Sequence, residues 1–129
     1  MKMLAPLLAA IDDYALYVRG WDGEHSEPYK LSFLLYAKDV VRALIASLYW
    51  RSLRPTAITI CPEDDSCISV FCSYEDRAVE LYIFGDDIDL TVFLSALGKK
   101  DRLFHFTPHL FSGSVFEREI DWLEGVERT

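Results

Sequence analysis

The chain has 129 residues, 51% of them hydrophobic and 26% charged, and its formal net charge at pH 7 is −8. This length suits one domain around one core, and the composition excludes an intrinsically disordered chain, so we predict a single domain over residues 1–129. The acidic excess lies in residues 56–129, whose balance is −9, whereas residues 1–55 carry +1. Such a field disfavours direct binding to nucleic acid or to an anionic membrane and favours a basic protein partner. The alternative is that the charge only keeps the domain soluble.

Apolar side chains at helical spacing predict two N-terminal helices. The first is expected from about Leu4 to Val18, and a loop with two glycines follows at 19–27. The second is expected from about Pro28 to Arg51, because proline suits a first helical turn and a wide apolar stripe follows it. We expect Leu44 and Leu48 in this stripe to be buried against a sheet. No stretch of the sequence reaches the roughly 20 apolar residues that a membrane span requires.

From residue 57 onward the apolar period changes to two, which is typical of β-strands. The segments between the apolar runs are short and rich in turn-forming residues, so the strands should form an antiparallel meander. Strands are expected at 57–61, 67–73, 78–84 and 88–94, with a fifth at 103–107 after a loop at 98–101. A closing helix is expected at 114–124, with Ser114 and Glu117 as a capping box. The predicted fold class is α+β, with two N-terminal helices, an antiparallel four- to five-stranded meander and a short C-terminal helix.

One face of this predicted sheet is apolar, whereas the second face mixes aromatic and acidic side chains. A solvent-facing sheet surface is normally polar, and burying unpaired carboxylates is costly. Aromatic groups set among carboxylates are therefore typical of an interface with a partner. The candidate protein-binding residues of this face are Phe71, Glu80, Tyr82, Phe84, Asp89 and Phe93. The alternative is that the C-terminal helix or the first helix covers the face.

The cysteines Cys61, Cys67 and Cys72 lack the close pairing of ligands that structural zinc sites show. His105 and His109 do not complete such a pattern, so we predict three unpaired thiols and no metal site. Free thiols indicate a reducing compartment, and we therefore expect the protein in the cytoplasm.

Calcium binding and catalysis also lack a recognisable motif. The Asp-rich segments at 64–65 and 86–89 do not have the glycine and glutamate offsets of an EF-hand and are interpreted as turns. Residues 112–114 do not form a G-x-S-x-G nucleophile elbow, and no phosphate-binding glycine loop occurs. We predict no catalytic residue and no cofactor and favour a protein that is not an enzyme. A histidine base whose partners meet only in space is the alternative.

The loop after the first helix contains Trp21-Asp22-Gly23. Trp21 is expected to anchor the loop and Gly23 to allow a positive φ, but Trp21 is also a candidate protein-binding residue as a partner hot spot. A Trp-Asp-Gly loop followed by a proline, a long helix and an acidic meander resembles a pattern in small bacterial proteins without an established activity. Those proteins often read Trp-Asp-Gly-x-Gly-Ala, whereas Glu24-His25-Ser26 stands here. The resemblance covers residues 11 to about 93 and implies no functional residue.

These observations favour a non-catalytic protein-binding module whose acidic, aromatic-bearing sheet face meets a basic partner. An antitoxin, immunity or inhibitor role fits, because electrostatic steering gives such pairs fast association. A homodimer through the same face is another form of this interface. The alternative class is a small-molecule sensor or minor enzyme with a pocket between the second helix and the sheet.

Overall fold

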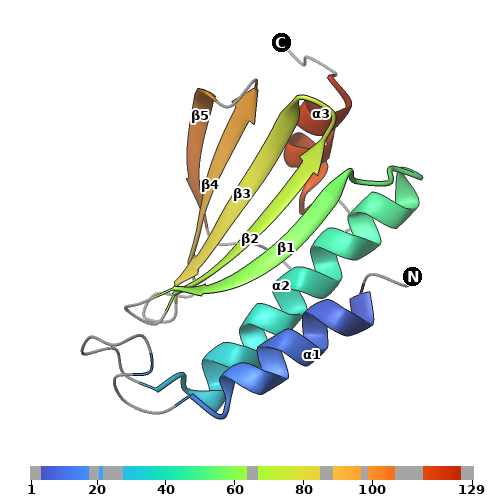
Figure 1. Cartoon of the computed structure of the whole chain (residues 1–129). Coiled ribbons are helices and arrows are strands. Elements are labelled where there is room, and N and C mark those ends of the chain that lie inside the picture. Colours follow the sequence, from blue (N-terminus) through green and yellow to red (C-terminus); the bar gives the residue numbers. More distant parts are fainter. Residues whose placement is uncertain are drawn as a thin grey trace.

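The computed structural model describes residues 4–17, 21, 28–63, 67–84, 89–96, 99–106 and 115–125, except for the side chains of residues 89, 99–101 and 106. Within these ranges, two helices precede five strands and one helix follows them. Figure 1 shows how these elements are arranged. The elements are α1 (Leu4–Tyr14), α2 (Leu31–Trp50), β1 (Ala57–Glu63), β2 (Cys67–Tyr74), β3 (Arg77–Phe84), β4 (Asp89–Ala96), β5 (Lys99–Phe106) and α3 (Glu117–Glu124). This order confirms the predicted α+β fold class.

The five strands form one antiparallel sheet in the order β1-β2-β3-β4-β5, which confirms the predicted meander. The two-residue turn Glu75-Asp76 joins β2 to β3 and sets their register. β5 begins at Lys99, so the prediction of a loop at 98–101 is wrong for most of that segment. Its charged residues have the composition of a loop, but an edge strand tolerates them because it pairs on only one side.

The core lies between the helices and one face of the sheet, hereafter called the helix face. In α2, Leu44 and Leu48 are 1% and 0% exposed, which confirms the prediction that they are buried. Alternate residues of the three central strands are buried on the helix face. They are Ile68, Val70, Cys72, Val79, Leu81, Ile83, Leu90, Val92 and Leu94. These side chains form one hydrophobic cluster with residues from all three helices.

The first helix is shorter than its apolar stripe predicts. α1 ends at Tyr14 rather than near Val18, because the amides of Ala15, Leu16 and Tyr17 each donate to a carbonyl three residues back and tighten the chain into turns. The last buried residue of this helix is Tyr14, whereas Ala15, which the predicted stripe included, is exposed. None of the helices in the described ranges combines the length and apolarity that a bilayer crossing requires.

The C-terminal helix lies against the helix face of the sheet. α3 begins at Glu117 with Phe116 as its N-cap, and that cap makes no side-chain hydrogen bond. The expected cap Ser114 lies outside the described residues. Burial of the Phe116 side chain orients the start of this helix instead. Its Trp122 indole Nε1 donates to the Ser95 carbonyl at 3.2 Å, which ties α3 to β4.

A buried carboxylate lies in the first turn of α3. Glu119 is 1% exposed, and its Oε1 lies 3.3 Å from Arg118 Nη2. Its Oε2 is buried and has no hydrogen-bond partner among the described residues. Burial raises the pKa of the Glu119 carboxyl, the nearby Asp121 carboxylate adds to the rise, and Arg118 opposes it. Folding therefore favours the protonated form of this group.

We expect Glu119→Gln to raise the free energy of unfolding at pH 7 by about 1–2 kcal/mol, because the charge that is buried without full hydrogen bonding is removed. The pKa of Glu119 is higher in the folded state than in the unfolded state. Its contribution to stability is therefore fully present at pH values below the unfolded-state pKa, and it is lost as pH rises through the folded-state pKa. In urea unfolding, the free energy of unfolding should fall less from pH 4 to pH 7 for Glu119→Gln than for the unaltered chain. Glu117→Gln, at a half-buried position in the same turn, is the control. Equal declines for Glu119→Gln and the unaltered chain would contradict this account.

Candidate protein-binding face

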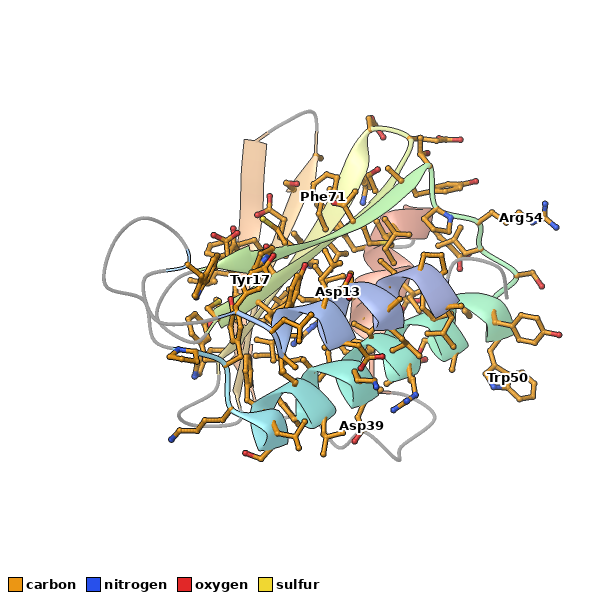
Figure 2. The ribbon with its side chains drawn as sticks, turned by 60° about the horizontal axis from the view of Figure 1, so that its bottom comes forward. Asp13, Tyr17, Asp39, Trp50, Arg54 and Phe71 are labelled. Atoms are coloured by element: carbon orange, nitrogen blue, oxygen red, sulfur yellow. The ribbon has the colours of Figure 1, made fainter. Side chains whose placement is uncertain are left out.

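The face of the sheet opposite the helix face carries no described helix. α1, α2 and α3 all contribute to the one core on the helix face, so the alternative that the first or last helix covers the second face does not hold among the described residues. Figure 2 shows Phe71 on the side of the sheet away from α1 and α2. We call this surface the open face and define it by the residues that register places on it. They include Thr59, Cys61, Glu63, Ser69, Phe71, Glu80, Tyr82, Phe84, Asp89, Thr91, Phe93, Leu103 and His105, together with Cys67, Ala78 and Ser95, which are buried.

The open face has a central row that runs across adjacent strands. Phe71 of β2 is paired with Glu80 of β3, and Glu80 is paired with Phe93 of β4. The row continues to Leu103 of β5. Directly opposed side chains on one sheet face lie about 5 Å apart, so a single carboxylate lies between two aromatic side chains.

Tyr82 connects this central row to the next one. Its hydroxyl donates to Glu80 Oε2 at 2.9 Å, and its ring meets the Phe93 ring edge-on with centroids 5.5 Å apart. Burial and the hydrogen bond to Glu80 raise the pKa of the Tyr82 phenol to about 12. The phenol therefore stays protonated at neutral pH and remains a donor to the carboxylate. This geometry fixes both the aromatic pair and the carboxylate in one orientation.

The aromatic side chains of the open face are partly accessible. Phe71 is 38% exposed and Phe84 is 36% exposed, whereas Tyr82 and Phe93 are half-buried against each other. Leu103 is more exposed than any of them, at 60%. The sequence alternation predicts these accessible aromatic positions but does not single out Leu103, whose strand begins earlier than expected.

Polar pairs flank the aromatic groups. The Ser69 hydroxyl donates to Glu63 Oε1 at 3.0 Å, and Thr91 Oγ1 lies 3.0 Å from His105 Nδ1. Register pairs Asp89 with Phe84, so it belongs to the same face, but its side chain is outside the described residues. A centre with aromatic groups inside a polar rim is the usual organisation of a protein interface.

The remaining candidate, Trp21, lies apart from the open face. Its ring packs on Tyr17 at 4.8 Å and on Tyr29 at 5.7 Å, within an aromatic cluster next to α1 and α2. The Tyr29 hydroxyl contacts the carbonyl oxygens of Glu63 and Cys67 at 2.6 and 2.9 Å. Through these contacts, the segment between α1 and α2 is held against the end of the β1–β2 hairpin. This arrangement is compatible with Trp21 as the residue that anchors its loop.

None of the cysteines Cys61, Cys67 and Cys72 forms a disulfide, and Cys61 is exposed whereas Cys67 and Cys72 are buried. Burial raises the pKa of the Cys72 thiol to about 12, so it is not a thiolate at neutral pH. Across the described ranges, no three His, Cys, Asp or Glu side chains come together as a metal site would require. The Asp-rich segments at 64–65 and 86–88, and His109, lie outside those ranges.

A cleft of about 260 Å³ lies between the end of α2 and the start of α3. It is lined by Ser47, Trp50, Arg51, Glu117 and Ile120. Arg51 is already paired there, with its Nη2 2.7 Å from Asp121 and its Nε 3.1 Å from Glu124. Between α2 and the sheet, where a pocket was considered from sequence, core side chains such as Leu44 form one hydrophobic cluster. The cleft is therefore in a different place from the pocket considered from sequence.

Sequence reasoning missed the exposed apolar residues outside the sheet. Trp50 is 83% exposed and projects from the last turn of α2, as Figure 2 shows. Tyr49 is exposed beside it, and Leu31 and Leu35 are exposed near the start of the same helix. The helical period places these residues outside the buried stripe. It does not distinguish a side chain that contacts a partner from one that faces solvent. These residues form a natural control surface for tests of the open face.

Comparison with protein-family models, with curated proteins and with solved structures finds no match to this chain.

Proposed function

We propose that this chain is a non-catalytic protein-binding module that presents its open face to a partner protein with a basic surface. The observation that supports this most is the central row, over which no described helix lies and in which Phe71, Glu80 and Phe93 are paired on adjacent strands. Aromatic groups give contact area at low loss of side-chain entropy, and a carboxylate among them gives directional attraction to a cation. An antitoxin, immunity or inhibitor role is the kind of function that this surface fits.

The charge of the chain supports a basic partner over other classes of ligand. The net charge of −8 repels nucleic acid and anionic lipid and attracts a positively charged protein at long range. Such steering raises association rates and makes them sensitive to salt. The absence of a disulfide among the three cysteines is compatible with a reducing compartment, and we propose the cytoplasm as the location.

Site-specific photo-crosslinking in the native host tests this proposal. We expect benzoylphenylalanine placed at Phe84 or at Phe71 to form one discrete adduct with a second, basic protein, because both positions are accessible on the open face. The same group placed at Trp50, which is 83% exposed on α2, is the matched control and should give no such adduct. Mass spectrometry of the adducts identifies the captured protein.

Three results would contradict the proposal. The first is an adduct from Trp50 and none from the open face, and the second is no adduct from either surface. The third is an adduct made of two copies of this chain, which would identify the open face as a dimer interface instead of a site for a basic partner.

A further inference from the structure

We propose that Phe71, Glu80 and Phe93 form the seat for one arginine side chain of the partner, so that the open face recognises a guanidinium group. This inference rests on the protein-binding function proposed above and specifies the chemistry of its central contact. The guanidinium would pair with the Glu80 carboxylate and lie against the aromatic side chains on either side of it.

The sheet geometry provides the space for such a group. Adjacent strands lie about 4.8 Å apart, so the side chains of Phe71 and Phe93 leave the sheet roughly 9–10 Å apart with Glu80 between them. A flat cation that approaches from above meets the carboxylate beneath it and an aromatic side chain on each flank. The flanking rings also exclude water from the ion pair, which strengthens it relative to an exposed pair.

The carboxylate is already oriented for this contact. The Tyr82 hydroxyl holds Glu80 Oε2 at 2.9 Å, and Tyr82 is itself braced against Phe93. No ion pair in the described part of the chain involves Glu80. A group held in its binding geometry before the partner arrives loses less entropy on binding, so the site is preorganised for a cation.

Arginine fits this seat better than lysine. A guanidinium is planar, stacks on aromatic rings and offers a fork of N–H donors to a carboxylate, whereas an ammonium is a compact, strongly hydrated charge. The chain's own arginines stack in this manner on the helix face. The Arg77 guanidinium lies 4.3 Å from the centre of the Trp122 ring, and that of Arg118 lies 3.4 Å from the Phe104 ring.

Titration of the full-length ¹⁵N-labelled chain with a capped Gly-Arg-Gly peptide tests the inference by nuclear magnetic resonance. We expect saturable shifts of the Phe71, Glu80 and Phe93 amides with a dissociation constant on the order of millimolar, as suits a single side chain. The matched Gly-Lys-Gly peptide should bind at least threefold more weakly, and the citrulline peptide, which has no charge, should produce no shifts at these amides.

Substitutions assign the binding to the seat. Glu80→Gln keeps a hydrogen-bond acceptor for Tyr82 but removes the charge, and it should weaken binding of the arginine peptide at least tenfold. Phe93→Leu keeps an apolar side chain without a ring. It should weaken binding of the arginine peptide and leave the affinity for the lysine peptide nearly unchanged. Asp76→Asn removes the same charge from an exposed turn and is the control that should have no effect.

Equal affinity for the arginine and lysine peptides would overturn the inference, as would unchanged binding by Glu80→Gln. Shifts confined to other parts of the chain would overturn it as well. These outcomes are separate from the cross-linking result. A partner captured at the open face together with no preference for arginine removes the arginine seat and leaves the protein-binding function standing. If the arginine peptide binds as expected but no partner is captured, the arginine seat stands and the proposed protein-binding function is contradicted.

Discussion

Leu44→Ala is expected to lower the free energy of unfolding by about 2–5 kcal/mol, the range for truncating a fully buried leucine. Leu44 is 1% exposed in the middle of α2, where it belongs to the cluster that joins the helices to the helix face. The substitution removes apolar contact area and leaves a cavity that surrounding strands cannot close completely, because sheet register holds them in place. Urea unfolding followed by circular dichroism measures the change.

The matched control for this prediction is Leu35→Ala in the same helix. Leu35 is 53% exposed, so its truncation should change the free energy of unfolding by no more than about 0.5 kcal/mol. A loss below about 1 kcal/mol for Leu44→Ala, or equal losses for the two variants, would contradict the placement of the core between α2 and the sheet.

The sequence predicts the helices and strands that have a strong apolar period. α2 and the three central strands follow directly from it, because each buries one face and the period alone identifies that face. Element ends were less predictable. α1 closes early through local turn hydrogen bonds, and β5 extends into the charged residues at 99–102, where composition resembles a loop but pairing with β4 decides the structure.

The open face was predictable in part for the same reason. Alternation along β3 places Glu80, Tyr82 and Phe84 together on one side without any knowledge of other strands. The position of Phe71 and Phe93 on either side of Glu80 depends on register, which the lengths of the connecting turns fix and the strand sequences alone do not. The location of Trp21 depends on a long-range aromatic cluster around Tyr29, which carries no local signal.

The double substitution Tyr82→Ala and Phe84→Ala is expected to weaken partner binding by at least about 30-fold, because truncation of a central aromatic contact typically costs about 2 kcal/mol or more. Its effect on folding should be smaller. Tyr82 loses an edge-on contact with Phe93 and a hydrogen bond to Glu80, each worth about 1 kcal/mol, and Phe84 is already 36% exposed. Phe84→Ala alone is the cleaner variant, since it leaves the Tyr82 contacts intact.

The most direct test of a protein-binding open face is the affinity of these variants for the cross-linked partner, measured beside their unfolding free energy. We predict that Phe84→Ala and the double variant lose affinity while remaining folded, and that the control pair Leu35→Ala and Tyr49→Ala on α2 keeps full affinity. Equal affinity for the open-face variants and the unaltered chain would contradict the account, as would a loss of affinity confined to the α2 variants.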